Sequence, residues 1–228
     1  NVIYADDIHP YKQRKVKILN GSHTAMVPVA YLRGIDTVGE AVNDEVIGKY
    51  VRDFIFDEVN PTINLPQEQL NSFAGSVIER YKNPYIRHEL MSISLNSTTK
   101  FKTRILPTLL DYVKIKGELP RHVLFSFAAL VLFYRGKRGK EEIKLSDDPA
   151  YLAKWKEMWS GFGGDFKKLA KEALGWTEAW GLDLNTVHPD ITSTVAKYLE
   201  LQCTKGMEEA VNRFVNGADN SAFKWAKK

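Results

Sequence analysis

Apolar residues recur every three or four positions along most of this 228-residue sequence, which is the spacing of helices with one buried face. The pattern is clearest over residues 46–59 and again over residues 66–82. A third segment, residues 123–134, is apolar except for Ser126 and predicts a helix that is buried on all sides. Patterns of alternating apolar and polar residues, which would predict strands, are weak throughout. The sequence therefore predicts an all-α fold.

The first long helix is expected to begin at Lys15 or two residues later and to end at Gly34, because glycine commonly follows the last turn of a helix. Pro28 lies inside this segment and is expected to kink or split the helix. Residues 1–14 would form an extended lead-in. Residues 15–228 would form a single helical domain.

Capping residues mark the next helices. Thr37 and Glu40 have the spacing of a capping box, in which the two residues satisfy each other's backbone N–H groups. They predict a short helix, after which Asn43 is expected to cap the helix that follows.

Composition indicates a packed globular chain, since 44% of the residues are hydrophobic and 11% are aromatic. The single cysteine, Cys203, excludes an intrachain disulfide framework, and no apolar run is long enough to cross a membrane. The net charge of +4 is mild and its basic residues are scattered, so nucleic acid is not a predicted partner. This charge would help to attract an anionic substrate. The five histidines and one cysteine show no metal-ligand spacing, so no metal site is predicted.

Candidate chemistry is concentrated in the segment that contains Lys15, Asn20 and His23. Three neighbouring cations and partial burial would disfavour the protonated form of Lys15 and suit it to proton transfer. Asn20 can donate to a developing oxyanion, and His23 shares a helix face with it. Lys15 and Asn20 are five residues apart, which separates them on an ideal α-helix. Spacing alone therefore favours a solvated basic helix start with a surface histidine.

The sequence from Lys15 to His23, with the form Lys-x-x-x-x-Asn-x-x-His, resembles the signature of the mannitol dehydrogenase family of polyol-specific long-chain dehydrogenases. Residues 15–44 and 88–107 are most similar to its uronate-reducing branch, and within that branch to the tagaturonate reductases. The resemblance implies a multi-helix C-terminal substrate domain, of the type also found in 6-phosphogluconate dehydrogenase. It implies that Lys15 is the general acid/base, that Asn20 helps to hold the reacting oxygen and that His23 orients the substrate. It implies no catalytic metal.

A second group of candidates lies between residues 88 and 104. In the family that the sequence resembles, a lysine near the position of Lys100 contacts the substrate. A uronate also needs a cation for its carboxylate, and Arg104 could bind it through two hydrogen bonds. Solvated charges are the alternative for these side chains. His88 is a further candidate substrate-binding residue, with a structural role as the alternative.

No glycine-rich dinucleotide motif follows a predicted strand. Residues 161–164 and 136–140 contain glycines but lack the required spacing and context. The resemblance implies that NAD is the cofactor and that an N-terminal Rossmann domain, absent from this chain, binds it, so no cofactor-binding residue is expected here. We therefore expect the C-terminal part of a longer cytoplasmic enzyme, inactive alone, with that domain and a small sugar-acid substrate as its partners.

The function implied by the resemblance is NAD-dependent reduction of tagaturonate to altronate in hexuronate catabolism. Fructuronate, mannitol and mannitol 1-phosphate are alternative substrates within the same family. A helical interaction or dimerisation module without activity is the alternative from another class.

Overall fold

The computed structural model describes residues 7–217, and this part of the chain confirms the all-α prediction. Its only strands are β1 (Lys137–Arg138) and β2 (Glu141–Glu142), which pair antiparallel. None of the described helices is long and apolar enough to cross a membrane. The α-helices are α1 (His9–Arg14), α2 (Ser22–Arg33), α3 (Val38–Asn43), α4 (Glu45–Asp53), α5 (Gln67–Tyr81), α6 (Leu90–Ile93), α7 (Ser97–Arg104), α8 (Leu106–Lys116), α9 (Arg121–Phe133), α10 (Pro149–Ser160), α11 (Phe166–Leu174), α12 (Thr177–Trp180), α13 (Ile191–Lys205) and α14 (Met207–Val215), with π-helical segments η1 (Lys15–Gly21) and η2 (Phe54–Val59) and 3₁₀ turns η3 (Asn60–Thr62) and η4 (Leu184–Thr186).

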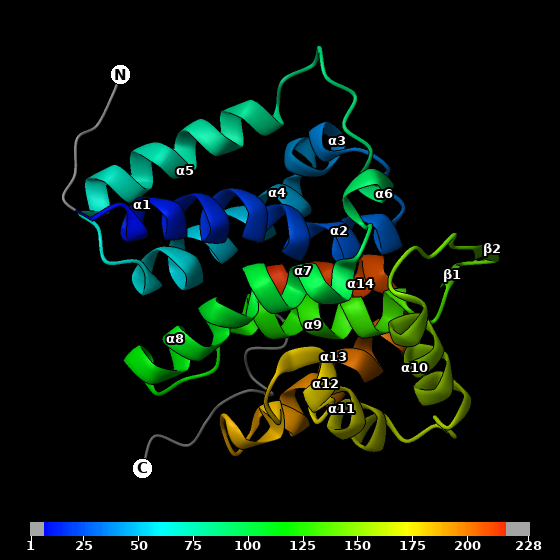
Figure 1. The fold of residues 1–228 in the computed structure, drawn as a ribbon. Coiled ribbons are helices and arrows are strands. Elements are labelled where there is room, and N and C mark those ends of the chain that lie inside the picture. Colours follow the sequence, from blue (N-terminus) through cyan, green and yellow to red (C-terminus); the bar gives the residue numbers. More distant parts are fainter. Residues whose placement is uncertain (1–6, 218–228) are drawn as a thin grey trace.

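The helices are arranged around α9, the predicted buried helix (Figure 1). Every residue from Val123 to Phe133 is buried, including the polar Ser126, whose hydroxyl donates to the carbonyl of Ala25 at 3.0 Å. Helix α13 packs along one side of α9 and α2 along another. Burial of a large apolar side chain contributes about 1.5–3 kcal/mol, so this central helix holds the N-terminal and C-terminal helices together.

The start of α2 differs from the prediction, because helix begins at His9 and continues through η1 without a break. Residues 9–14 are therefore helical rather than an extended lead-in, while residues 1–6 lie outside the described part. Pro10 sits in the first turn of α1, where its missing N–H is not needed. Pro28 does not split α2, since it is buried in the core, where packing outweighs one lost hydrogen bond. The helix ends at Gly34 as predicted, with φ of +113°.

The predicted capping box is confirmed. The hydroxyl of Thr37 accepts from the Glu40 N–H at 3.2 Å, and the Glu40 carboxylate accepts from the Thr37 N–H at 3.0 Å. The next cap is Asp44 rather than Asn43, which is the last residue of α3. A carboxylate at this position also interacts favourably with the helix dipole.

Glu58 is a buried carboxylate at the start of α9. It lies in η2 and is 4% exposed, within the predicted helical segment over residues 46–59. Its two oxygens accept from the N–H groups of His122 at 2.7 Å and Val123 at 2.9 Å. The His122 ring lies 2.8 Å from the same carboxylate. Glu58 therefore satisfies the first turn of the central helix from a segment more than sixty residues away.

Replacing Glu58 by Ala is expected to lower the free energy of unfolding by about 3 kcal/mol, because buried N–H groups would lose their acceptor. Urea unfolding measures the effect. Asp57→Ala provides a matched control, since the neighbouring carboxylate is exposed. Equal stability losses in the two variants would contradict the capping role of Glu58.

Candidate active site

The motif that contains Lys15 and Asn20 forms a π-helical turn. The segment η1 runs from Lys15 to Gly21, between α1 and α2. In an α-helix with about 3.6 residues per turn, a step of five residues points the two side chains in different directions. A π-helix is wound more widely, with hydrogen bonds between residues five apart. The π-helical turn therefore brings Lys15 and Asn20 towards one face, although their five-residue spacing would separate them on an α-helix.

Two hydroxyl groups stabilise the end of this turn. Ser22 Oγ donates to the carbonyl of Ile18 at 2.5 Å, and Tyr81 Oη donates to the carbonyl of Leu19 at 2.7 Å. The two hydroxyls are themselves 2.8 Å apart. Burial raises the pKa of Tyr81, so the phenol remains protonated and able to donate. These bonds satisfy carbonyls at the point where the wide turn changes to regular α-helix.

Lys15 is exposed and Asn20 is half-buried. Within residues 7–217 neither side chain has a hydrogen-bond partner, so both are available to a ligand. The partial burial expected for Lys15 is not provided by this part of the chain.

His23 lies against the rings of Tyr81 and His88 and close to the cation of Arg104. Its ring centroid is 4.2 Å from that of Tyr81 and 5.3 Å from that of His88. Burial lowers the pKa of His23 to about 3, with smaller contributions from His88 and Arg104, so the imidazole is neutral at pH 7. Its Nε2 atom is closed to solvent and has no hydrogen-bond partner among the described residues. Such an unsatisfied atom costs about 1–3 kcal/mol, and a ligand hydroxyl could satisfy it after movement of a neighbouring side chain.

Helix α7 brings two cations to the same region. Arg104 Nη1 lies 3.4 Å from the hydroxyl of Thr24, the residue after His23. Lys100, one turn earlier, donates to the carbonyl of Ile93 at 2.8 Å. Burial lowers the pKa of both side chains, and in Lys100 the neighbouring Arg104 lowers it further. Neither cation forms a salt bridge within the described part of the chain.

Gly21 allows this close approach of α7. A Cβ atom at this position would lie 3.3 Å from the carbonyl oxygen of Arg104, closer than ordinary contact. Lys102, between the two site cations in sequence, points away and lies against Gly181 at the end of α12. The structure thus groups His23, His88, Lys100 and Arg104, and it places Lys102 elsewhere.

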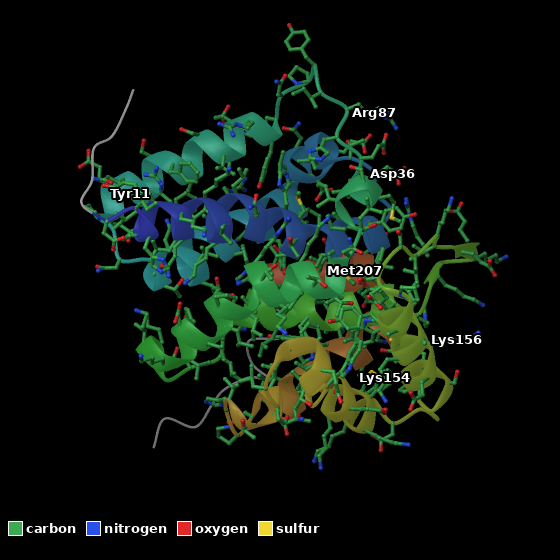
Figure 2. The ribbon with its side chains drawn as sticks, in the orientation of Figure 1. Tyr11, Asp36, Arg87, Lys154, Lys156 and Met207 are labelled. Carbon is green, nitrogen blue, oxygen red and sulfur yellow. The ribbon has the colours of Figure 1, made fainter. Side chains whose placement is uncertain are left out.

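His88 reaches the site from the loop between α5 and α6, which projects from the helices (Figure 1). The side chains of this loop extend into solvent, as the labelled Arg87 illustrates (Figure 2). The base of the loop is held to the first residue of α3, because the Val38 N–H donates to the carbonyl of His88 at 2.9 Å. His88 itself is half-buried.

Asp147 supports the start of α7, a role that the sequence did not reveal. Its carboxylate accepts from the Thr98 N–H at 3.0 Å and from the hydroxyl of Tyr134. The hydroxyl of Thr98 accepts from the Trp155 indole at 3.1 Å. Its neighbour Asp148 caps α10. No local pattern signals the pairing, since Asp147 and Thr98 are 49 residues apart.

The described residues contain no group of three histidine, cysteine or acidic side chains that could hold a metal ion. Residues 161–164 connect α10 to α11, and residues 136–140 belong to the β1–β2 hairpin. Neither glycine-rich segment leads from a strand into a helix, so neither fits the pyrophosphate of a dinucleotide.

Comparison with known protein families matches residues 7–202 to the mannitol dehydrogenase C-terminal domain. The chain belongs to this family. The resemblance that the motif suggested is therefore confirmed.

This mannitol dehydrogenase domain is 45% identical to altronate oxidoreductase from Yersinia pestis over 214 residues. It is 47% identical to altronate oxidoreductase from Escherichia coli over the same number of residues. Each match covers 92% of this chain and 44% of the relative. The chain therefore spans less than half the length of these relatives.

Two solved structures share the fold. The first is mannitol 2-dehydrogenase from Pseudomonas fluorescens, in a ternary complex with NAD and D-mannitol, with a TM-score of 0.81 and 21% identity. It matches 95% of this chain and 43% of the other. The second is a substrate-free D-sorbitol dehydrogenase, with a TM-score of 0.76 and 22% identity over 91% of this chain and 41% of the other. At these identities the likeness supports the helical domain fold, and no function is drawn from it.

The neutral state of His23 has a measurable consequence. Because its pKa is lower in the folded state than in the unfolded state, the unfolded state binds more protons between about pH 6.5 and pH 3. This histidine therefore reduces stability as the pH falls through that window, by about 1–2 kcal/mol at pH 5. Urea unfolding of His23→Gln should show a correspondingly smaller loss of stability between pH 7 and pH 5.

His9→Gln is the matched control, since His9 is exposed and contacts solvent before and after unfolding. The same loss of stability in wild type and His23→Gln would show that His23 is not held neutral.

Proposed function

We propose that this domain is the catalytic and substrate-binding part of an NAD-dependent tagaturonate reductase, which interconverts D-tagaturonate and D-altronate. The observation that carries the proposal is the π-turn that presents Lys15 and Asn20 without other partners, beside the cations of α7. The identity to altronate oxidoreductases supports the choice of substrate. Fructuronate or a neutral polyol remains the alternative within the family.

Lys15 would act as the general acid in the direction of reduction. Its ammonium gives a proton to the carbonyl oxygen of the substrate as that oxygen gains an electron pair, and the lysine becomes a neutral amine. In the reverse direction the amine takes the proton from the hydroxyl. Asn20 donates from its amide to the same oxygen while negative charge develops on it.

His23 would hold a neighbouring hydroxyl of the substrate. As a neutral imidazole it can accept a hydrogen bond without adding a charge to a site already rich in cations. His88, half-buried and in ring contact with His23, would contact the substrate beside it.

Arg104 and Lys100 would bind the carboxylate at the far end of the substrate. Burial lowers the pKa of each, so a nearby anion would favour their charged forms. Neither has a carboxylate in salt-bridge contact among the described residues, whereas Lys17 pairs with Asp111 and Arg33 pairs with Asp44. A sugar acid supplies that missing charge and a neutral polyol does not.

The cofactor would be held mainly by an N-terminal domain of the same polypeptide, because the described residues do not fit a dinucleotide. Bound NADH would supply the hydride that adds to the keto carbon. Relatives more than twice as long as this chain support a further domain of that kind.

The first test is NADH oxidation by the complete polypeptide with D-tagaturonate, D-fructuronate and D-fructose. We expect the highest kcat/KM with tagaturonate, and Lys15→Met should lower kcat by about 100- to 10,000-fold, the usual contribution of a general acid. Lys12→Met is the matched control, because Lys12 is an exposed lysine one helical turn earlier. Near-wild-type turnover in Lys15→Met would exclude its catalytic role, and activity with another substrate would change the assignment.

The second test separates acidic from neutral substrates. Arg104→Ala should reduce kcat/KM for tagaturonate about 10- to 100-fold, the effect of losing a hydrogen bond to a charged group, and should change it little for fructose. Lys102→Ala, on the opposite side of α7, should leave both substrates unaffected. If Arg104→Ala impaired both substrates equally, the carboxylate would have to bind elsewhere.

A further inference from the structure

Lys17 has an environment opposite to that of Lys15, although the two lysines are two residues apart. It is 2% exposed, while Lys15 is exposed. We infer that Lys17 is a positioning residue, which together with Asp111 and Thr62 holds the π-turn in the register that presents Lys15 and Asn20. The consequence for turnover rests on the proposed function, whereas the effect on the turn does not.

The ammonium of Lys17 is fully satisfied. It donates to Asp111 Oδ2 at 2.6 Å, to the carbonyl of Thr62 at 3.1 Å and to the Thr62 hydroxyl at 3.1 Å. These three bonds use all three donors of the group. The Thr62 hydroxyl donates in turn to the carbonyl of Val59 at 2.8 Å, which fixes it as the acceptor from Lys17. Lys17 therefore has no donor left for a substrate.

These contacts join the motif to two distant segments. Thr62 ends η3, 45 residues along the chain, and Asp111 lies in α8, 94 residues along the chain. Helix α8 follows directly after α7, which carries Arg104 and packs against η1. One ammonium group thus links the turn that presents Lys15 to the helix pair that presents the site cations.

The ion pair between Lys17 and Asp111 adds little to the stability of the fold. The Asp111 side chain is 43% exposed, so water screens the pair and its net contribution is small. Burying the ammonium has a desolvation cost that an apolar side chain would avoid. The three bonds of Lys17 do, however, fix the position of η1 relative to η3 and α8. A π-turn needs such support because regular α-helix is the more stable alternative.

The partial exposure of Asp111 allows a test in which the fold survives. In Asp111→Asn the amide keeps the shape and can still accept from Lys17, so the free energy of unfolding should change by less than about 1 kcal/mol. We expect amide hydrogen exchange in residues 15–21 of the complete polypeptide to rise about three- to fivefold, while the other helices keep their protection. Exchange followed by mass spectrometry measures this directly.

Turnover provides the second readout. Displacement of a catalytic group by about 1 Å can cost about 100-fold, so kcat of Asp111→Asn should fall at least about tenfold with little change in KM. Lys17→Met should produce a similar loss, and the double variant should lose no more than either single variant. The control is the ion pair between Lys154 and Glu157 on α10, which is 3.1 Å long. In Figure 2, Lys154 lies far from Tyr11 of α1. Lys154→Met and Glu157→Gln should leave kcat and the exchange of residues 15–21 unchanged.

Unchanged exchange in residues 15–21 of Asp111→Asn would overturn the inference. So would additive losses of kcat in the double variant, or a loss that matches a general loss of stability. If the complete wild-type polypeptide reduced none of the three substrates, the proposed function would fail, and the exchange measurement would still decide whether Lys17 holds the turn.

Discussion

A step of five residues does not fit the period of an α-helix, and the site face of this domain depends on the wider turn that accommodates it. Residues 15–21 form that turn, which is less stable than regular helix and needs external support. The supports come from three other segments: Tyr81 of α5 at one end, and Thr62 and Asp111 on η3 and α8 at the other. The rest of the domain brings these segments together around α9, which is buried on all sides.

Charged groups inside the domain fall into two kinds according to their partners. Glu58 and Lys17 are buried and fully hydrogen-bonded, so they fix one segment to another and have no capacity for a ligand. Lys100 and Arg104 are half-buried and have no salt-bridge partner in the described residues, so their charge is only partly compensated. A protein pays the desolvation of an uncompensated cation only where something later offsets it. The lack of a salt-bridge partner for Lys100 and Arg104 therefore favours an anionic ligand beside these two side chains.

The sequence predicted what depends on local pattern. The apolar period located α4, α5 and α9, and the Thr37–Glu40 spacing identified a real capping box. It missed the π-turn, because residue periodicity cannot distinguish a wide turn from regular helix. It also could not separate Lys15 from Lys17, since the distinction depends on Asp111, 94 residues away. The family resemblance located the motif, but the partners that hold each side chain became visible only in three dimensions.

The exposure of Lys15 bears on how such a site would work. A lysine in contact with bulk water is an ordinary cation, and hydrogen bonds to a developing oxyanion are weak there because water competes for both groups. Exclusion of water strengthens both. The described residues leave Lys15 exposed on one side of the turn, so a second surface would have to close over it before proton transfer becomes efficient. Relatives more than twice as long as this chain have the additional polypeptide from which such a surface could come. On this argument the helical domain of the proposed enzyme would fix the positions of the reacting groups, and a covering surface of the kind that the longer relatives have room for would set their reactivity.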